Sequence, residues 1–131
     1  MNDYDHDDVQ TFLTDYGAAL SAGDLDTISD CYAYPALVVD DARSLLVPDP
    51  ESVRDAFRSA TRGYRDRGLV AAVAQITRLE TTGAALLWVD VRWSYRDEYA
   101  REAAAESYRY LLRRGRDRFE ICVVAPTDAG T

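Results

Sequence analysis

The sequence predicts an α+β fold in which most of the helices precede an antiparallel sheet. Up to Gly68, apolar residues recur at intervals of three and four, as they do on one face of a helix. Beyond Gly68 they alternate with polar residues, as they do in a half-buried strand. Helical patterns in one half of a chain and strand patterns in the other are typical of α+β proteins.

The first third of the chain should form two helices and a short hairpin. Gly23 ends the first helix and Asp24 can cap a second, short one that stops at Tyr34-Pro35. The runs 36–39 and 45–47 are β-prone, and the polar residues between them indicate a hairpin turn. The apolar face of the first helix consists of Val9, Phe12, Leu13, Tyr16 and Leu20.

A third helix and four long strands should complete the fold. Asp49-Pro50-Glu51 combines a cap, a proline at the first helical position and an early acid, which predicts a helix over 50–67. The alanines at 103–105 favour helix by intrinsic propensity, but a long hairpin partner for 84–95 requires strand there. The predicted strands are therefore 69–79, 84–95, 101–112 and 119–124, with Gly115-Arg116-Asp117 as the last turn.

The composition fits one acidic globular domain over residues 1–131, with an ordered core at 6–124 and a tail at 125–131. The 131 residues carry a net charge of −8, and 47% of them are hydrophobic. An acidic surface repels nucleic acid, and no apolar run approaches the ~18 residues that a membrane span needs. The acidic start also differs from the basic beginning of a signal peptide, so we expect a cytoplasmic protein without nucleic-acid or membrane partners.

No motif for a metal, a nucleotide or an activated nucleophile is present. Cys31 and Cys122 lack the spacing of a zinc site, and glycine-rich phosphate loops are missing. We therefore expect no cofactor and no metal.

The segment 16–26, Tyr-Gly-Ala-Ala-Leu-Ser-Ala-Gly-Asp-Leu-Asp, followed by Ile28 and Tyr32, resembles the nuclear-transport-factor-2-like superfamily. This group includes SnoaL-like polyketide cyclases, ketosteroid isomerases and scytalone dehydratase, and the resemblance covers almost the whole chain. It implies a cystatin-like cone, in which three N-terminal helices pack on a strongly curved antiparallel sheet around a pocket. It also implies frequent dimerisation through the sheet.

The resemblance also implies candidate catalytic residues. Counted from Gly23-Asp24, Tyr16 falls on the hydrogen-bonding tyrosine of the ketosteroid isomerases and Asp40 on their general base, while Tyr32 matches a supporting tyrosine. The late-strand acid of those enzymes has no counterpart, because Tyr108 or Arg109 stands there. Asp40 also fits an ordinary turn, since Asp40-Asp41 can bond its own backbone, and Tyr16 also fits a core tyrosine.

Three functions remain open at this point. The first is a pocket protein that binds a small hydrophobic metabolite. The second is a cofactor-free isomerase, cyclase or lyase, with Asp40 as general base and Tyr16 as the donor to an enolate oxygen. The third is a non-catalytic dimerisation or protein-interaction domain. The predicted ligand contacts are Tyr32, Phe57, Trp88, Tyr108 and Arg109.

A homodimer is also expected from the pattern of the long strands. Leu86, Trp88 and Leu111 lie on the face opposite to the strictly alternating apolar residues. One face of the sheet can therefore fill the pocket while the other is covered by a second copy.

Overall fold

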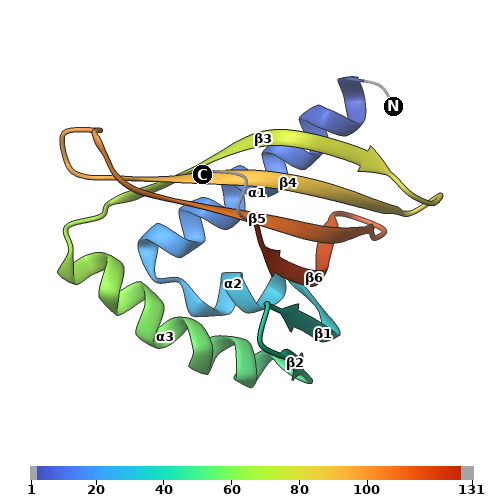
Figure 1. Cartoon of the computed structure of the whole chain (residues 1–131), viewed down its shortest axis with the longest axis horizontal. Helices are drawn as coiled ribbons and strands as arrows, with labels where there is room; N and C mark the ends of the chain where they lie inside the picture. Colours follow the sequence, from blue (N-terminus) through green and yellow to red (C-terminus); the bar gives the residue numbers. More distant parts are fainter. Residues whose placement is uncertain (1–2, 128–131) are drawn as a thin grey trace.

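The computed structural model describes residues 3–127, whose helices gather on one side of a curved sheet (Figure 1). Figure 1 shows the strands following one another from β3 at the top to β2 at the bottom, with α3 along the lower edge. The elements are α1 (Asp3–Ala22), α2 (Leu25–Asp30), β1 (Tyr32–Val39), β2 (Ser44–Val47), α3 (Pro50–Asp66), β3 (Ala71–Thr81), β4 (Leu86–Arg96), β5 (Glu102–Arg114) and β6 (Phe119–Pro126). The predicted α+β class is confirmed.

The sheet contains six strands in the order β2-β1-β6-β5-β4-β3. The long strands β3 to β6 pair antiparallel, as predicted, and the alanine-rich segment 103–105 belongs to β5. The short β1–β2 hairpin joins the same sheet through a parallel pairing of β1 with β6. This pairing was not predicted, because contacts between segments so far apart in the chain leave no local pattern in the sequence.

β1 begins at Tyr32, before the Tyr34-Pro35 step at which the short helix was expected to stop. The helix instead ends at Asp30, where the Cys31 backbone N–H bonds the carbonyl oxygens of Ile28 and Ser29. The Tyr34-Pro35 peptide is cis, and it lies where the β1–β6 register shifts between Tyr32 and Leu37. A proline is tolerated in a strand at such an irregularity, because no ladder hydrogen bond needs its missing N–H.

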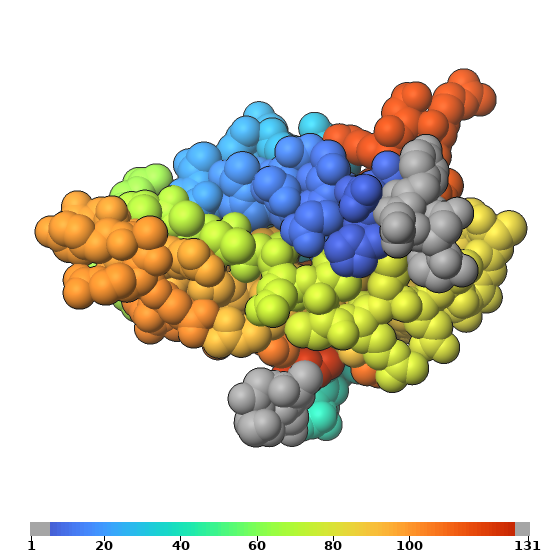
Figure 2. All heavy atoms as spheres, turned by 90° about the horizontal axis from the view of Figure 1, so that it is seen from above, coloured from blue at the N-terminus to red at the C-terminus, as the bar shows by residue number. Residues whose placement is uncertain are grey.

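The core lies between α1 and the concave face of the sheet. On β4 the residues Leu87, Val89, Val91, Trp93 and Tyr95 are all buried, which confirms the predicted alternation. Figure 2 shows α1 lying alongside β3.

Gly17 allows α1 to approach the sheet closely. A Cβ atom at this position would lie 2.6 Å from the Ala72 carbonyl oxygen and 2.9 Å from the Trp93 ring. Only glycine fits this crossing without a shift of the helix or the strand.

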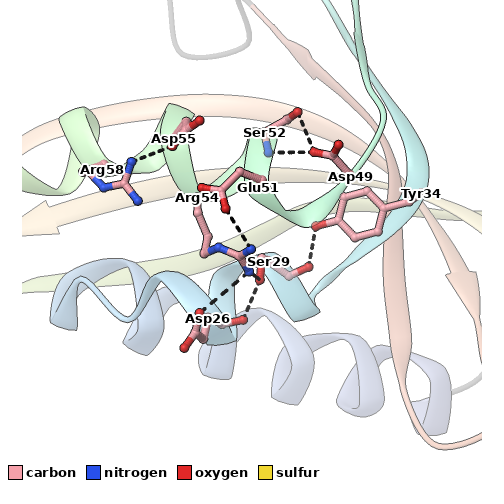
Figure 3. Close-up of polar contacts among 9 residues, drawn as sticks. All are labelled: Asp26, Ser29, Tyr34, Asp49, Glu51, Ser52, Arg54, Asp55 and Arg58. Atoms are coloured by element: carbon pink, nitrogen blue, oxygen red, sulfur yellow. Dashed lines mark hydrogen bonds and ion pairs between the residues drawn. The ribbon is translucent and has the colours of Figure 1, made fainter.

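Polar contacts tie α2 to both α3 and β1 (Figure 3). The Arg54 guanidinium lies 3.2 Å from the Glu51 carboxylate and 3.8 Å from that of Asp26, and it donates to the Ser29 hydroxyl at 3.5 Å. The Tyr34 hydroxyl donates to the Ser29 carbonyl oxygen at 2.6 Å. Since exposed ion pairs contribute little stability, the main effect of these contacts is to set the position of α3.

Candidate functional site

A cavity of about 420 Å³ lies between α3 and the concave face of the sheet. Its wall is mostly apolar and includes six tyrosines and one tryptophan, and among the residues that the structure describes no charged side chain lines it. The lining residues are Tyr16, Leu20, Tyr32, Val38, Leu45, Leu46, Val47, Ser52, Val53, Ala56, Phe57, Tyr64, Trp93, Tyr95, Tyr108, Tyr110 and Val124.

Four of the lining residues, Tyr16, Tyr32, Trp93 and Tyr110, form a buried inner cluster with short hydrogen bonds. The hydroxyl oxygens of Tyr16 and Tyr32 are 2.7 Å apart, and the Trp93 indole Nε1–H donates to the Tyr110 hydroxyl at 2.8 Å. The four side chains belong to different elements, α1, β1, β4 and β5, so these bonds connect the wall across the fold.

Burial keeps the inner phenols protonated. It raises the pKa of Tyr16, Tyr32 and Tyr110 well above the usual value for a phenol. Of the Tyr16–Tyr32 pair, one hydroxyl donates and the other keeps its own hydrogen, and Tyr110 accepts from Trp93 and keeps its hydrogen as well. The inner cluster can therefore donate hydrogen bonds to a carbonyl or ether oxygen of a bound molecule.

A second polar group, the Glu106 cluster, consists of Tyr64, Tyr95, Tyr108 and Glu106. The Tyr64 hydroxyl donates to that of Tyr95 at 3.5 Å, and the two rings stack with their centroids 5.1 Å apart. The Tyr108 hydroxyl donates to a carboxylate oxygen of Glu106 at 3.4 Å. These bonds are longer than those of the inner cluster and close to the limit of a hydrogen bond.

The rim of the cavity is apolar where β2 borders it. Leu45 and Leu46 are 49% and 62% exposed, although both line the cavity. β2 is an edge strand, so only β1 pairs with it. Large exposed apolar side chains beside an apolar cavity are typical of a ligand entrance.

The structure brings four of the predicted site residues into this cavity. Tyr16 and Tyr32 meet in the inner cluster, Phe57 comes from α3 and packs beside Tyr32, and Tyr108 belongs to the Glu106 cluster. All four residues line the same cavity, and their roles in binding stay predictions.

Trp88 and Arg109 lie on the opposite face of the sheet. They border a shallow depression together with Asp90, and the Arg109 guanidinium makes two hydrogen bonds to the Asp90 carboxylate, at 2.6 and 3.0 Å. Alternation explains this placement, because Trp88 and Asp90 point away from the side taken by Val89 and Val91. The structure therefore does not bring them together with Tyr16.

Asp40 lies in the exposed β1–β2 turn and outside the cavity lining. Its carboxylate accepts hydrogen bonds from the backbone N–H groups of Ala42, at 2.8 Å, and Arg43, at 3.0 Å. These two bonds lower the pKa of Asp40. A general base in an apolar pocket has a raised pKa, so this geometry favours the turn role over the catalytic one.

Sequence reasoning missed Tyr64, Trp93, Tyr95, Glu106 and Tyr110 as site residues. Trp93 and Tyr95 belong to the strictly alternating face of the predicted strand 84–95, which was expected to fill the pocket without either residue being named as a ligand contact. The signal was present, since Glu106, Tyr108 and Tyr110 alternate on one face of β5 and pair with the inward-facing Trp93, Val91 and Val89.

Among the side chains that the structure describes, those of residues 6–127, no group of three His, Cys, Asp or Glu forms a candidate metal site. In the same part of the chain, no helix is both long and apolar enough to cross a membrane.

A curved sheet closed by helices around an apolar, tyrosine-rich cavity defines a cone-shaped α+β fold. Residues 6–129 match the family described as NTF2-like protein (DUF6841), and the chain belongs to this family. The resemblance predicted from the sequence is thus confirmed. No curated protein matches the sequence.

Solved structures with the same fold support this assignment. Aln2 from a Streptomyces species has a TM-score of 0.74 at 10% identity, with 99% of this chain and 94% of that one covered. An NTF2-like protein with a cystatin-like fold from Novosphingobium aromaticivorans has a TM-score of 0.68 at 10% identity, covering 94% and 80%. A ketosteroid isomerase-like protein from Erwinia carotovora atroseptica has a TM-score of 0.61 at 11% identity, covering 91% and 92%. At these identities the likeness shows the cystatin-like fold alone.

Proposed function

We propose that the protein binds a small, mostly apolar metabolite in the cavity beneath α3. One observation carries this proposal: the cavity of about 420 Å³ is lined by apolar groups and neutral phenols, with no charged side chain among the residues described. Its volume falls within the roughly 300–1,000 Å³ of small-molecule sites, whose walls are mostly apolar with a few polar groups.

The phenols indicate what the ligand carries. Tyr110 and one member of the Tyr16–Tyr32 pair each have a hydroxyl hydrogen to offer, and their raised pKa keeps that hydrogen in place at neutral pH. A ring system with a carbonyl or ether oxygen would satisfy these donors. A ligand anion would find no cation in the lining to offset its loss of hydration.

Binding has more support here than proton-transfer catalysis. A cofactor-free isomerase, cyclase or lyase needs a proton acceptor beside the phenols, and Asp40 is held in a solvent-exposed turn by two backbone hydrogen bonds. The pairing of Tyr16 with Tyr32 suits the stabilisation of an enolate oxygen, but it supplies only half of such a site.

The proposal is tested by equilibrium dialysis with 1-methylnaphthalene, an uncharged aromatic probe. We expect saturable binding to one site. Ala56 lines the cavity, so Ala56→Phe should fill the site and weaken binding by at least about tenfold. Ser59→Phe, an exposed position on the same helix outside the lining, is the matched control and should leave binding unchanged. No binding to the wild type, or equal binding to both variants, would overturn the proposal.

We also propose a cytoplasmic homodimer that pairs through the outer face of the sheet. Trp88 pairs with Leu111 and Leu111 with Val123, so an apolar strip crosses β4, β5 and β6 on this face. The unpaired Cys31 and Cys122 fit a reducing compartment. Light scattering should give twice the 14.7 kDa mass of the chain, and Leu111→Arg should return the monomer. A monomeric wild type would contradict the dimer.

A further inference from the structure

Glu106 adjoins the cavity from the same face of β5 as two of its lining tyrosines. It pairs with Trp93 across β4 and alternates with Tyr108 and Tyr110. No register shift separates these three residues, so all of them lie on the concave side of the sheet. Glu106 therefore brings a carboxylate beside a cavity whose own lining is uncharged.

The Glu106 carboxylate has no arginine partner. Within residues 3–127, no arginine nitrogen lies within 4.0 Å of it, and its hydrogen-bonding contacts are the hydroxyls of Tyr108, at 3.4 Å, and of Tyr95. Glu102 on the same strand differs, because Arg92 donates to both of its carboxylate oxygens at 2.8 Å. These bonds hold the pKa of Glu102 at about 2. Two neutral phenols leave part of the hydrogen-bonding capacity of the Glu106 carboxylate unused by the protein.

The charge of Glu106 raises the pKa of the three phenols around it. After burial, which is the largest cause, the Glu106 carboxylate contributes to the raised pKa of Tyr64, Tyr95 and Tyr108, that of Tyr108 reaching about 12. The hydrogen bond with Tyr95 and, to a smaller extent, the charge of Arg67 act in the opposite direction and lower the pKa of Tyr64. The phenols thus remain neutral, and the carboxylate is the acceptor at the end of this group.

The hydrogen bonds of this cluster are long enough for a ligand to replace them. Tyr64 and Tyr95 are 3.5 Å apart and Tyr108 and Glu106 3.4 Å, against 2.7 and 2.8 Å in the inner cluster. Hydrogen bonds from a hydroxyl to a carboxylate are normally near 2.5–2.7 Å, so the bond from Tyr108 to Glu106 is weak for its type. A ligand donor that reached the Glu106 carboxylate would form a shorter and stronger hydrogen bond than the one from Tyr108 that it replaced.

We propose that the Glu106 cluster is the polar end of the binding site and accepts a hydrogen bond from a donor group on the ligand, either a hydroxyl or a protonated amine. This inference rests on the proposed function, because the apolar body of the ligand occupies the cavity. The ligand is then amphipathic, with its donor group at Glu106. The net charge of −8 also favours a neutral or cationic ligand, since it repels anions.

Four probes with one aromatic body test this: 1-methylnaphthalene, 1-naphthalenemethanol, 1-(aminomethyl)naphthalene and 1-naphthoate. Equilibrium dialysis at pH 7 should rank the amine or the alcohol at least about tenfold above the hydrocarbon, as a hydrogen bond to a charged group allows. The naphthoate should bind more weakly than the hydrocarbon. A preference for the amine over the alcohol identifies a cationic donor, and the reverse order identifies a hydroxyl.

Glu106→Gln supplies the decisive variant. It should remove the preference for the donor-bearing probes while leaving the affinity for 1-methylnaphthalene unchanged. Glu102→Gln removes the same charge from the same strand, where the carboxylate binds Arg92 instead, and should leave all four affinities unchanged. A preference that survives Glu106→Gln, or one lost equally in Glu102→Gln, would overturn the inference.

The two proposals fail in distinguishable ways. If 1-methylnaphthalene binds and Ala56→Phe abolishes its binding, the cavity is a ligand site whatever Glu106 does. A wild type that then binds all four probes equally would refute the role of Glu106 alone. If none of the probes binds the wild type, both proposals fail together.

Discussion

Two groups of tyrosines line the same cavity and use their hydroxyls differently. In the inner cluster, Tyr16 and Tyr32 are 2% and 7% exposed and share a 2.7 Å hydrogen bond. In the Glu106 cluster Tyr95 is buried, but Tyr64 and Tyr108 are half-buried and Glu106 is exposed, and the hydrogen bonds measure 3.4 and 3.5 Å. The comparison indicates that the first group holds the cone together, while the second keeps its polar groups available.

The exposure of Glu106 and of its neighbours Tyr64 and Tyr108 accounts for the difference. A buried hydroxyl without a partner is costly, so the inner phenols and the Trp93 indole bond one another closely. Near the exposed Glu106, water can satisfy the same groups in the empty protein, and a ligand can replace that water. Substitutions should therefore change stability mainly in the inner cluster and ligand preference mainly in the Glu106 cluster.

The largest expected effect on stability comes from Trp93→Ala. Trp93 is among the largest fully buried side chains, and the substitution removes its ring contacts and its bond to Tyr110. We expect a loss of about 3–5 kcal/mol in the free energy of unfolding, measured by urea denaturation. Trp88→Ala, on the outer face of the same strand, should cost much less. Equal losses for the two tryptophans would contradict the assignment of the inner wall.

Gly17→Ala should have the next largest effect. The added Cβ atom would lie 2.6 Å from the Ala72 carbonyl oxygen, so α1 or β3 must move, at a cost of about 1–3 kcal/mol in the free energy of unfolding. Gly63→Ala is the control, since no atom lies within 4 Å of the new Cβ in α3. There the same change should stabilise the protein by about 0.4–1 kcal/mol. Stabilisation by both substitutions would show that α1 does not approach the sheet this closely.

The paired hydroxyls give a smaller effect and the sharpest test of the comparison. Tyr16→Phe and Tyr32→Phe should each lower the free energy of unfolding by about 1 kcal/mol. The double variant should lose less free energy of unfolding than the two single losses added together, because either substitution alone already removes the shared hydrogen bond. Tyr64→Phe should change stability by under about 0.5 kcal/mol, since its bond is long and water can replace it. Additive losses for Tyr16 and Tyr32 would contradict a direct bond between them.

Much of the fold could be predicted from local patterns. The apolar spacing of α1, the Asp49-Pro50 start of α3 and the alternation along β4 are each a property of one segment, and the structure confirms all three. The parallel pairing of β1 with β6 depends on how the β1–β2 hairpin meets a strand formed by the end of the chain. No pattern within either segment specifies that contact.

The site was less predictable, for two physical reasons. The side of a sheet on which a residue lies follows from alternation, which by itself excludes Trp88 and Arg109 from a cavity lined by Trp93 and Tyr110. Both were nevertheless expected as ligand contacts, Arg109 because it stands near the position of the late-strand acid of the isomerases. The place of Asp40 depends instead on how the turn closes, because its carboxylate is free either to bond the backbone of 42–43 or to face the cavity.

Asp40→Asn should have the smallest effect, and its pH dependence distinguishes the two roles of this residue. The backbone bonds from Ala42 and Arg43 lower the pKa of Asp40 below its ordinary value of 3.8. Its contribution to stability is therefore complete above pH 3.8 and is lost as the pH falls through the lower pKa of the folded state. We expect Asp40→Asn to destabilise the protein slightly at pH 7, and this difference should shrink at pH 3 when both proteins are denatured with urea.

Binding of 1-methylnaphthalene should not change, because Asp40 does not line the cavity. A stability difference of the same size at pH 3 would contradict the turn role, and a loss of probe binding would show that Asp40 acts on the cavity.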